Sequence, residues 1–158
     1  MQGRPEIIEL LNEVLTAELT AVNQYFGHAK MQKNWGYEKL AERTQHESID
    51  EMKHAEELIE RLLFLDATPK MEYMALSVGT NVKEQLEADL KLETNAVEMY
   101  NTAVKVSREA GDDTSRDLFS KLLKDEELHV DWLEAQLHQI KEMGYERYLS
   151  NQTEGPKD

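Results

Sequence analysis

The sequence contains no cysteine, only seven glycines and three prolines, and far fewer basic than acidic residues. The lack of cysteine excludes disulfide bonds, thiolate zinc sites and iron–sulfur clusters. With 18 Lys and Arg against 32 Asp and Glu, the net charge is −14. This charge argues against nucleic-acid binding, because phosphate contacts need a basic face, and it suits a protein that handles cations. Apolar runs such as Leu62–Leu65 are far too short to span a bilayer, and no apolar signal segment follows Met1. We therefore expect a soluble, cytoplasmic protein that binds neither nucleic acid nor membrane.

Hydrophobic periodicity and the few turn residues predict four long helices and no strands. The separators are Gly36, a connection from Asp66 to Gly79, and Gly111, and Gly144 ends the fourth helix. The predicted helices span residues 5–34, 37–65, 81–110 and 113–143, with a short fifth helix at 145–150 and a tail at 151–158. Short links make the first two helices antiparallel, and likewise the third and fourth, whereas the middle link is long enough to cross the bundle. We predict an all-α single domain, a four-helix bundle with one long crossover and a short C-terminal fifth helix.

An internal repeat relates residues that lie 75 positions apart. Leucines coincide at this offset, and so do several polar residues. The polar identities are Glu18 with Glu93, Tyr25 with Tyr100, Asp50 with Asp125, Glu51 with Glu126, and His54 with His129. Shared helical patterning explains matched leucines but does not easily explain matched acids, tyrosines and histidines. We infer two halves that are related by an approximate two-fold axis and converge on one central site.

Acidic residues and histidines of the repeat point to a metal site. Glu18 and Glu93 fall on core-facing stripes of their helices, where a carboxylate is costly unless it is paired or bound to metal. Either residue alone is also compatible with a salt bridge or with a helix turned toward solvent. The two Glu-x-x-His pairs shift the balance, because spacing i, i+3 places both side chains on one helix face. These pairs are Glu51–His54 and Glu126–His129. The whole set is the pattern of dinuclear carboxylate sites in four-helix bundles.

The ligand types indicate which metal such a site would take. Imidazole and carboxylate without thiolate favour iron or manganese, with zinc as a competitor. Four carboxylates supply a charge of −4, so two divalent cations would neutralise the site. We assign Glu51 and Glu126 as bridging ligands, Glu18 and Glu93 as terminal ligands, and His54 and His129 as one nitrogen ligand for each metal.

Neighbouring residues extend this interpretation. Asp50 and Asp125 are candidates to hold the second nitrogen of a histidine across the site, and solvated helix surface is the alternative for both. Tyr25 and Tyr100 lie two turns from the terminal glutamates. They could hydrogen-bond a ligand, donate an electron or simply pack in the core.

With these residues in hand, the sequence resembles the bacterioferritins over nearly its full length. The resemblance rests on residues 18–26 (ELTAVNQYF), 46–55 (HESIDEMKHA) and 125–134 (DEELHVDWLE). It implies a ferritin-like bundle with a di-iron ferroxidase site that holds two Fe per subunit, a homo-oligomeric cage of 24 subunits built from dimers, and a ferric mineral inside. It also implies haem b shared between two subunits, with Met52 of each as an axial ligand. Helical periodicity agrees, because it points Met52 out of the bundle.

The resemblance also implies roles for residues outside the central site. His46 and Asp50 would bind iron on the inner cavity wall, an ordinary polar pair being the alternative. Trp132 matches a family aromatic near the site, whereas Leu58 departs from members that have tyrosine there, which puts an electron relay through that position in doubt. Asn34, Asp66 and Asp131 resemble residues that line entry pores. We expect His28 and His138 to be surface histidines.

The function that follows is iron storage and detoxification, in which a ferroxidase oxidises Fe(II) to Fe(III) with O2 or H2O2. A ferredoxin-type protein is the expected reductant of the haem. One alternative is a di-iron oxygenase or peroxidase of the rubrerythrin kind, although the lack of cysteine removes the usual rubredoxin domain. Another is a helical assembly protein whose core acids are merely paired. The DNA-protecting mini-ferritins differ, because their sites lie between subunits.

Overall fold

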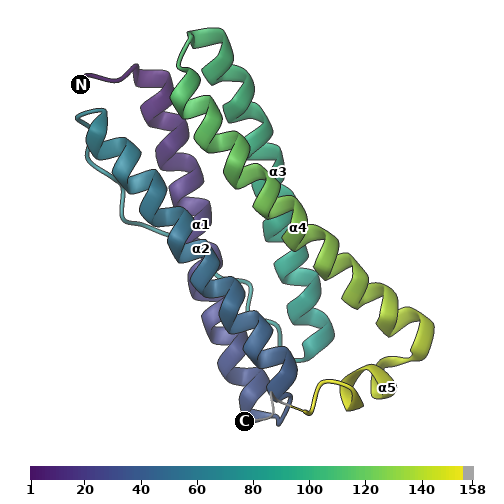
Figure 1. The fold of residues 1–158 in the computed structure, drawn as a ribbon. Coiled ribbons are helices and arrows are strands. Elements are labelled where there is room, and N and C mark those ends of the chain that lie inside the picture. The colour runs from purple at the N-terminus through teal and green to yellow at the C-terminus, as the bar shows by residue number, and fades with distance from the viewer. Residues whose placement is uncertain (155–158) are drawn as a thin grey trace.

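The computed structural model describes residues 1–154 of the 158-residue chain. Within this part it contains helices and no strands. The helices are α1 (Pro5–Asn34), α2 (Glu38–Phe64), α3 (Val82–Ala110), α4 (Asp113–Met143) and α5 (Tyr145–Ser150). The first four form two antiparallel pairs, α1 with α2 and α3 with α4, and α5 turns back at the end of α4 (Figure 1). The predicted all-α four-helix bundle, with a long crossover and a short fifth helix, is confirmed.

Side chains cap the starts of α3 and α4. Asn81 caps α3 by accepting a hydrogen bond from the Glu84 backbone N–H at 2.9 Å, and the Glu84 carboxylate accepts one from the Thr80 backbone N–H. Glu84 thus bonds the backbone of the residue before the cap, rather than that of the cap itself as in a standard capping box. Gly111 ends α3 in the left-handed region with φ of 74°, where a glycine avoids the steric cost that a Cβ would incur. Asp112 then caps α4 through the Ser115 backbone N–H at 3.0 Å.

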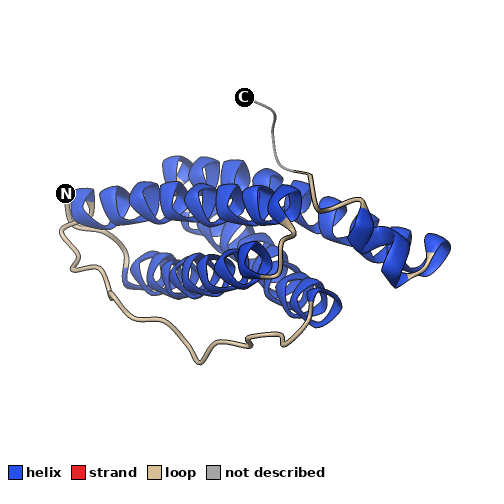
Figure 2. Ribbon diagram, turned by 90° about the horizontal axis from the view of Figure 1, so that it is seen from below, coloured by secondary structure: helices blue, strands red, loops and turns tan. Residues whose placement is uncertain are grey.

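Side chains of α1 hold the crossover between α2 and α3, which passes along one side of the bundle in Figure 2. The crossover has no helix or strand of its own, so its backbone N–H groups need other acceptors. Four residues spaced along α1 supply them. The bonds run from Lys70 to Asn12, from Met74 to Thr20, from Ser77 to Gln24, and from Gly79 to His28, at 2.9 to 3.0 Å. The polar face of α1 thus fixes the path of the crossover.

His28 is fully buried, so the expectation of a surface histidine is wrong. Its Nδ1 lies 2.9 Å from Asp89 Oδ1, which also accepts a hydrogen bond from Gln24. Burial raises the pKa of Asp89, and the bonds to His28 and Gln24 offset this only in part. Because Nε2 accepts from the Gly79 backbone, His28 is a structural link between the crossover, α1 and α3. His138 is exposed, as expected.

Two apolar clusters occupy the bundle core and leave a polar layer between them. One cluster contains Leu11 and Leu15 of α1 and Phe119 of α4, and the other contains Leu86 of α3 and Tyr148 of α5. Along α2, α3 and α4, the acids and histidines of the predicted site fall between residues of the two clusters. The apolar packing on both sides therefore positions the site. Among residues 1–154, none of the helices combines the length and apolar character that a membrane span requires.

The fifth helix closes the end of the bundle. The Tyr148 hydroxyl donates to Gln136 Oε1 of α4 at 2.8 Å. Just after α5, the Gln152 carbonyl accepts a hydrogen bond from the Lys39 backbone N–H near the start of α2. The predicted tail at 151–158 is therefore tied to α2 at its beginning, and its residues 155–158 lie outside the described part of the chain.

Candidate metal centre

All four long helices contribute to one buried cluster of acids and histidines. The structure brings together the six residues that the sequence singled out, and each is between 0 and 7% exposed. The members are Glu18 of α1, Glu51 and His54 of α2, Glu93 of α3, and Glu126 and His129 of α4. So much buried acid is unfavourable unless cations or protons compensate it.

The cluster divides into two overlapping groups that could each hold a metal ion. One group is Glu18, Glu51, His54 and Glu126, and the other is Glu51, Glu93, Glu126 and His129. Within each group the candidate ligand atoms lie within 4.8 Å of one another. Glu51 and Glu126 belong to both groups, whereas the other four residues belong to one. This is the arrangement that two neighbouring ions with two bridging carboxylates require.

Each histidine directs Nδ1 into the cluster. His54 Nδ1 lies 3.0 Å from Glu126 Oε1 and 3.5 Å from Glu18 Oε2. His129 Nδ1 lies 2.9 Å from Glu51 Oε1 and 3.6 Å from Glu93 Oε1. The two rings are nearly parallel, with centroids 6.3 Å apart. Both imidazoles therefore offer the same nitrogen to the centre, as the repeat implies.

Unpartnered polar atoms mark the interior of the cluster as a place for cations. Within the described residues, five buried atoms of the cluster make no well-oriented hydrogen bond, although some lie close to one another: Glu18 Oε2, Glu51 Oε1, Glu93 Oε2, Glu126 Oε2 and His129 Nδ1. Buried polar atoms are nearly always satisfied in folded proteins. All five atoms come from groups that bind iron, manganese or zinc, so the donor set fits a pair of such ions.

Without metal, protons compensate the crowded negative charge. Burial, together with the charges of Glu18 and Glu93, raises the pKa of both Glu51 and Glu126 well above the usual value. Burial also opposes ionisation of Glu18, but the neighbouring Glu51 and His54 side chains outweigh it and lower the pKa of Glu18 to about 2. Burial would lower the pKa of His54, yet its hydrogen bond to Glu126 and the nearby negative charge of Glu18 raise it to about 11. The metal-free centre therefore holds protons that binding cations would displace.

Two tyrosines hold the terminal acids across the two halves. The Tyr25 hydroxyl of α1 donates to Glu93 of α3, and the Tyr100 hydroxyl of α3 donates to Glu18 of α1 at 2.5 Å. Burial and the adjacent carboxylates raise the pKa of both phenols well above the usual value, so both remain donors. Of the roles considered from the sequence, hydrogen bonding to Glu18 and Glu93 is the one that the geometry displays.

The outer nitrogens of the histidines meet different partners in the two halves. His54 Nε2 lies 3.0 Å from Asp125 Oδ2, as expected. His129 Nε2 lies 3.9 Å from Asp50 Oδ2 but 2.5 Å from Glu47 Oε2, so Glu47, and not the candidate Asp50, is the nearest partner of that nitrogen. Glu47 lies one helical turn before Glu51, and that spacing could have identified it in the sequence.

Residues that the resemblance singled out lie around the centre. His46 Nε2 is 3.7 Å from Asp50 Oδ2, and both side chains reach solvent. Trp132 of α4 lies beneath the Arg43 guanidinium, 4.5 Å from the ring centroid, while Leu58 is fully buried in the apolar core.

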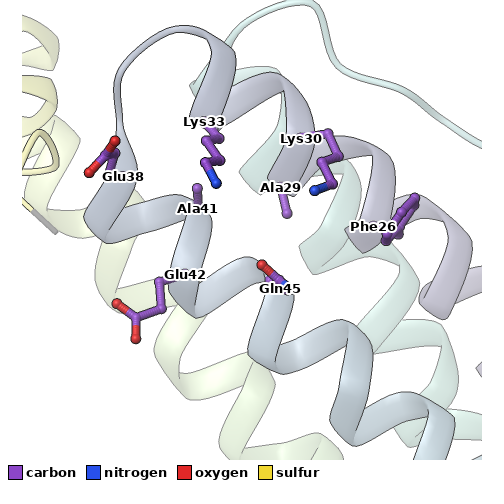
Figure 3. A pocket seen from close by; sticks show the side chains of 8 residues that line it. All are labelled: Phe26, Ala29, Lys30, Lys33, Glu38, Ala41, Glu42 and Gln45. Carbon is purple, nitrogen blue, oxygen red and sulfur yellow. The ribbon is translucent and has the colours of Figure 1, made fainter. Parts of the chain in front are cut away.

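Met52 projects from the outer face of α2 and is half exposed. On the same side, α1 and α2 enclose a shallow groove of about 250 Å³. Figure 3 shows its lining, with Phe26 and Lys30 on α1 facing Gln45 on α2. Met52 follows Gln45 by seven residues, about two turns, and so continues this face. The groove contains none of the six residues of the central cluster.

Comparison with known proteins agrees with this geometry. The family model described as ferritin-like domain matches residues 8–143. A bacterioferritin of Mycolicibacterium paratuberculosis is 48% identical over 149 residues, which cover 94% of each chain. The bacterioferritins of Streptomyces coelicolor and Brucella melitensis are 48% and 46% identical, covering 95% and 94% of this chain and 90% and 92% of their own. The chain therefore belongs to the ferritin-like family and, within it, to the bacterioferritins.

Proposed function

We propose that this protein stores iron and that each chain is a ferroxidase, with Fe(II) and O2 or H2O2 as substrates. The observation that supports this most strongly is the pair of overlapping ligand groups, which share Glu51 and Glu126 and have one histidine each. Membership of the bacterioferritins supports storage as the purpose of the oxidation. The six residues of the cluster are the proposed metal ligands.

The proposed roles follow from which groups each residue faces. Glu51 and Glu126 lie between the histidines and would bridge the two positions, while Glu18 and Glu93 would each serve one. Tyr25 and Tyr100 each donate to Oε1 of a terminal acid, and the unpartnered Oε2 of that acid would remain available to a metal ion. With four carboxylates ionised, the site matches the charge of two divalent cations.

Two bound Fe(II) ions supply the two electrons that reduce O2 to H2O2, or H2O2 to water, without release of a one-electron oxygen radical. The protein contributes position and protons. Binding of two cations displaces the protons held by Glu51, Glu126 and the histidines, and the surrounding buried acids keep the ions in place as charge changes. Asp125 and Glu47 orient the imidazoles through their outer nitrogens.

The proposal extends to the assembly. We propose a cage of 24 chains built from dimers, with haem b between two copies and Met52 of each copy as an axial ligand. The exposed thioether on the outer face of α2 fits such a ligand, and the haem would carry electrons for release of stored iron. A ferredoxin-type protein is the proposed reductant. His46 and Asp50, both open to solvent, are proposed as an iron site on the inner wall.

Substitution of cluster residues tests the ferroxidase proposal. Glu126→Ala and His129→Ala should abolish the rapid phase of Fe(II) oxidation, because each removes a buried ligand. Glu127→Ala is the matched control, since Glu127 is adjacent in sequence but exposed. Circular dichroism establishes that the helices persist. Rapid oxidation at the unsubstituted rate in a folded Glu126→Ala protein would contradict the assignment.

A further inference from the structure

The two halves of the metal centre hold their histidines in unequal ways. His54 Nε2 meets Asp125, whose side chain is 46% exposed, whereas His129 Nε2 meets Glu47, whose side chain is 6% exposed. A carboxylate at the surface is solvated and free to change rotamer, while a buried carboxylate is restricted by its surroundings and interacts more strongly with a nearby imidazole. The approximate two-fold symmetry of the sequence therefore breaks in the residues just behind the ligands.

Arg43 adds a second difference between the two halves. Its Nε donates to Glu47 Oε1 at 2.6 Å, which leaves Oε2 for His129. The guanidinium also lies 4.5 Å from the ring centroid of Trp132, a distance at which a cation is attracted to an aromatic face. Because Arg43 and Glu47 are on α2 and Trp132 is on α4, the stack connects the two helices that carry the histidines.

Within residues 1–154, the corresponding positions of the other half do not form this arrangement. The residues 75 positions after Arg43 and Glu47 are Leu118 and Leu122, and neither can form an ion pair. His54 has Asp125 as its one outer partner in the described structure. The arrangement around His129 is thus specific to one metal position rather than a consequence of the repeat.

There is also room for these side chains to move if Arg43 is lost. A surface pocket of about 520 Å³ is lined by Arg43, Glu47, Asp50 and His129 among others. Without its hydrogen bond to Arg43, Glu47 could turn toward this space, and Asp50 Oδ2, now 3.9 Å from His129 Nε2, would become a competing acceptor. Arg43 therefore restricts Glu47 to the one orientation that supports His129.

We propose that Arg43 is a positioning residue that acts through Glu47 on His129 and makes the metal position of His129 tighter than that of His54. The inference rests on the proposed dinuclear function and adds the order in which the two metal positions fill. The position next to His129 binds its metal ion first. Residues that orient a metal-bound histidine typically change metal affinity by about 10- to 100-fold. Arg43 acts one step further out, so its loss should cost about tenfold at one position.

Titration of the metal-free protein with Co(II) tests this proposal. The wild type should bind two ions per chain in two unequal steps. Arg43→Leu introduces leucine, the residue that the other half of the repeat has at the matching position, Leu118. This variant should weaken the tighter binding step by about tenfold and leave the weaker step unchanged. Arg108→Leu is the control, because Arg108 is an exposed arginine at the far end of α3.

A second measurement separates positioning from general stability. In the Co(II)-loaded protein, each ligating imidazole has an N–H proton with a strongly shifted resonance, and its exchange with water reports on the outer acceptor. Exchange should accelerate for one of the two protons in Arg43→Leu and for neither in Arg108→Leu. Arg43→Lys retains the charge without the planar donor and should restore the affinity only in part.

The outcomes distinguish this inference from the proposed function. Two Co(II) per chain in the wild type, with Arg43→Leu indistinguishable from Arg108→Leu in both measurements, would overturn the role of Arg43 alone. Equal weakening of both steps would overturn it as well. Fewer than two Co(II) per chain in the wild type would instead contradict the dinuclear centre.

Discussion

Substitution of a shared ligand should have a different consequence from substitution of an unshared one. Glu126 directs Oε1 to His54 Nδ1 at 3.0 Å and Oε2 to His129 Nδ1 at 3.5 Å, whereas Glu93 approaches His129 alone, at 3.6 Å. Glu126 belongs to both ligand groups and Glu93 to one. We therefore predict that Glu126→Gln weakens both metal positions and that Glu93→Gln weakens one.

The magnitude follows from the lost charge. Glutamine preserves the shape of the side chain and one acceptor oxygen, so the bond from Tyr25 to residue 93 can persist. At an effective dielectric constant of about 20, two unit charges about 4 Å apart interact by about 4 kcal/mol, which corresponds to roughly a thousandfold in affinity. With a divalent cation the loss is larger. Each affected position should therefore lose at least about three orders of magnitude in affinity.

The assay is the number of Co(II) ions bound at a concentration that just saturates the wild type, read from visible absorbance. We expect two ions per chain for the wild type, one for Glu93→Gln and none for Glu126→Gln. Glu127→Gln, which alters an exposed neighbour, should retain two. Retention of one ion with unchanged affinity by Glu126→Gln would refute the reasoning that this carboxylate serves both positions.

Three further predictions concern burial, pH and the outer face. His28→Leu removes a partner from a buried carboxylate and from a buried backbone N–H, and each unsatisfied group costs about 1–3 kcal/mol of stability. The urea midpoint of the metal-free protein should therefore fall, whereas His138→Leu at an exposed site should leave it unchanged. Equal midpoints for the two variants would refute the structural role of His28. Because the pKa of His54 is raised to about 11, a metal ion must displace a proton from this residue at neutral pH. The affinity for Co(II) should therefore fall by about tenfold per displaced proton for each unit decrease in pH. An affinity that does not depend on pH would contradict the protonated centre. Met52→Leu should abolish the Soret band of protein reconstituted with haem, and an unchanged band would show that Met52 is not the axial ligand.

Helical periodicity and the internal repeat predict most of this architecture. The spacing that places Glu51 and His54 on one face of a helix also fixes the direction in which they point once that helix packs. The repeat places a second Glu and His in the same way on another helix. The helix face on which each of the six residues lies is therefore encoded locally. The boundaries of α3 and α4 follow from their capping residues and from Gly111 and Gly144, whose chemistry is equally local.

Contacts between separate elements are what the sequence does not reveal. Fully buried His28 stands on a polar face of α1, which looks solvent-facing until the crossover is known to need hydrogen-bond acceptors there. Arg43 and Trp132 are 89 positions apart, and no periodicity relates them, so their stacking depends on how α2 and α4 pack. Glu47 is an intermediate case. Its spacing from Glu51 is visible in the sequence, but whether Glu47 or Asp50 contacts His129 depends on how far each side chain reaches across the bundle.

The most direct test of the central claim is a count of iron. Metal-free protein is titrated with Fe(II) without oxygen, air is admitted, and the near-ultraviolet ferric absorbance is followed against the iron added per chain. A rapid phase that saturates at two irons per chain, followed by slower growth, is the predicted result, because the two ligand groups provide two positions. Absence of a rapid phase, or saturation at one iron per chain, would contradict a dinuclear ferroxidase.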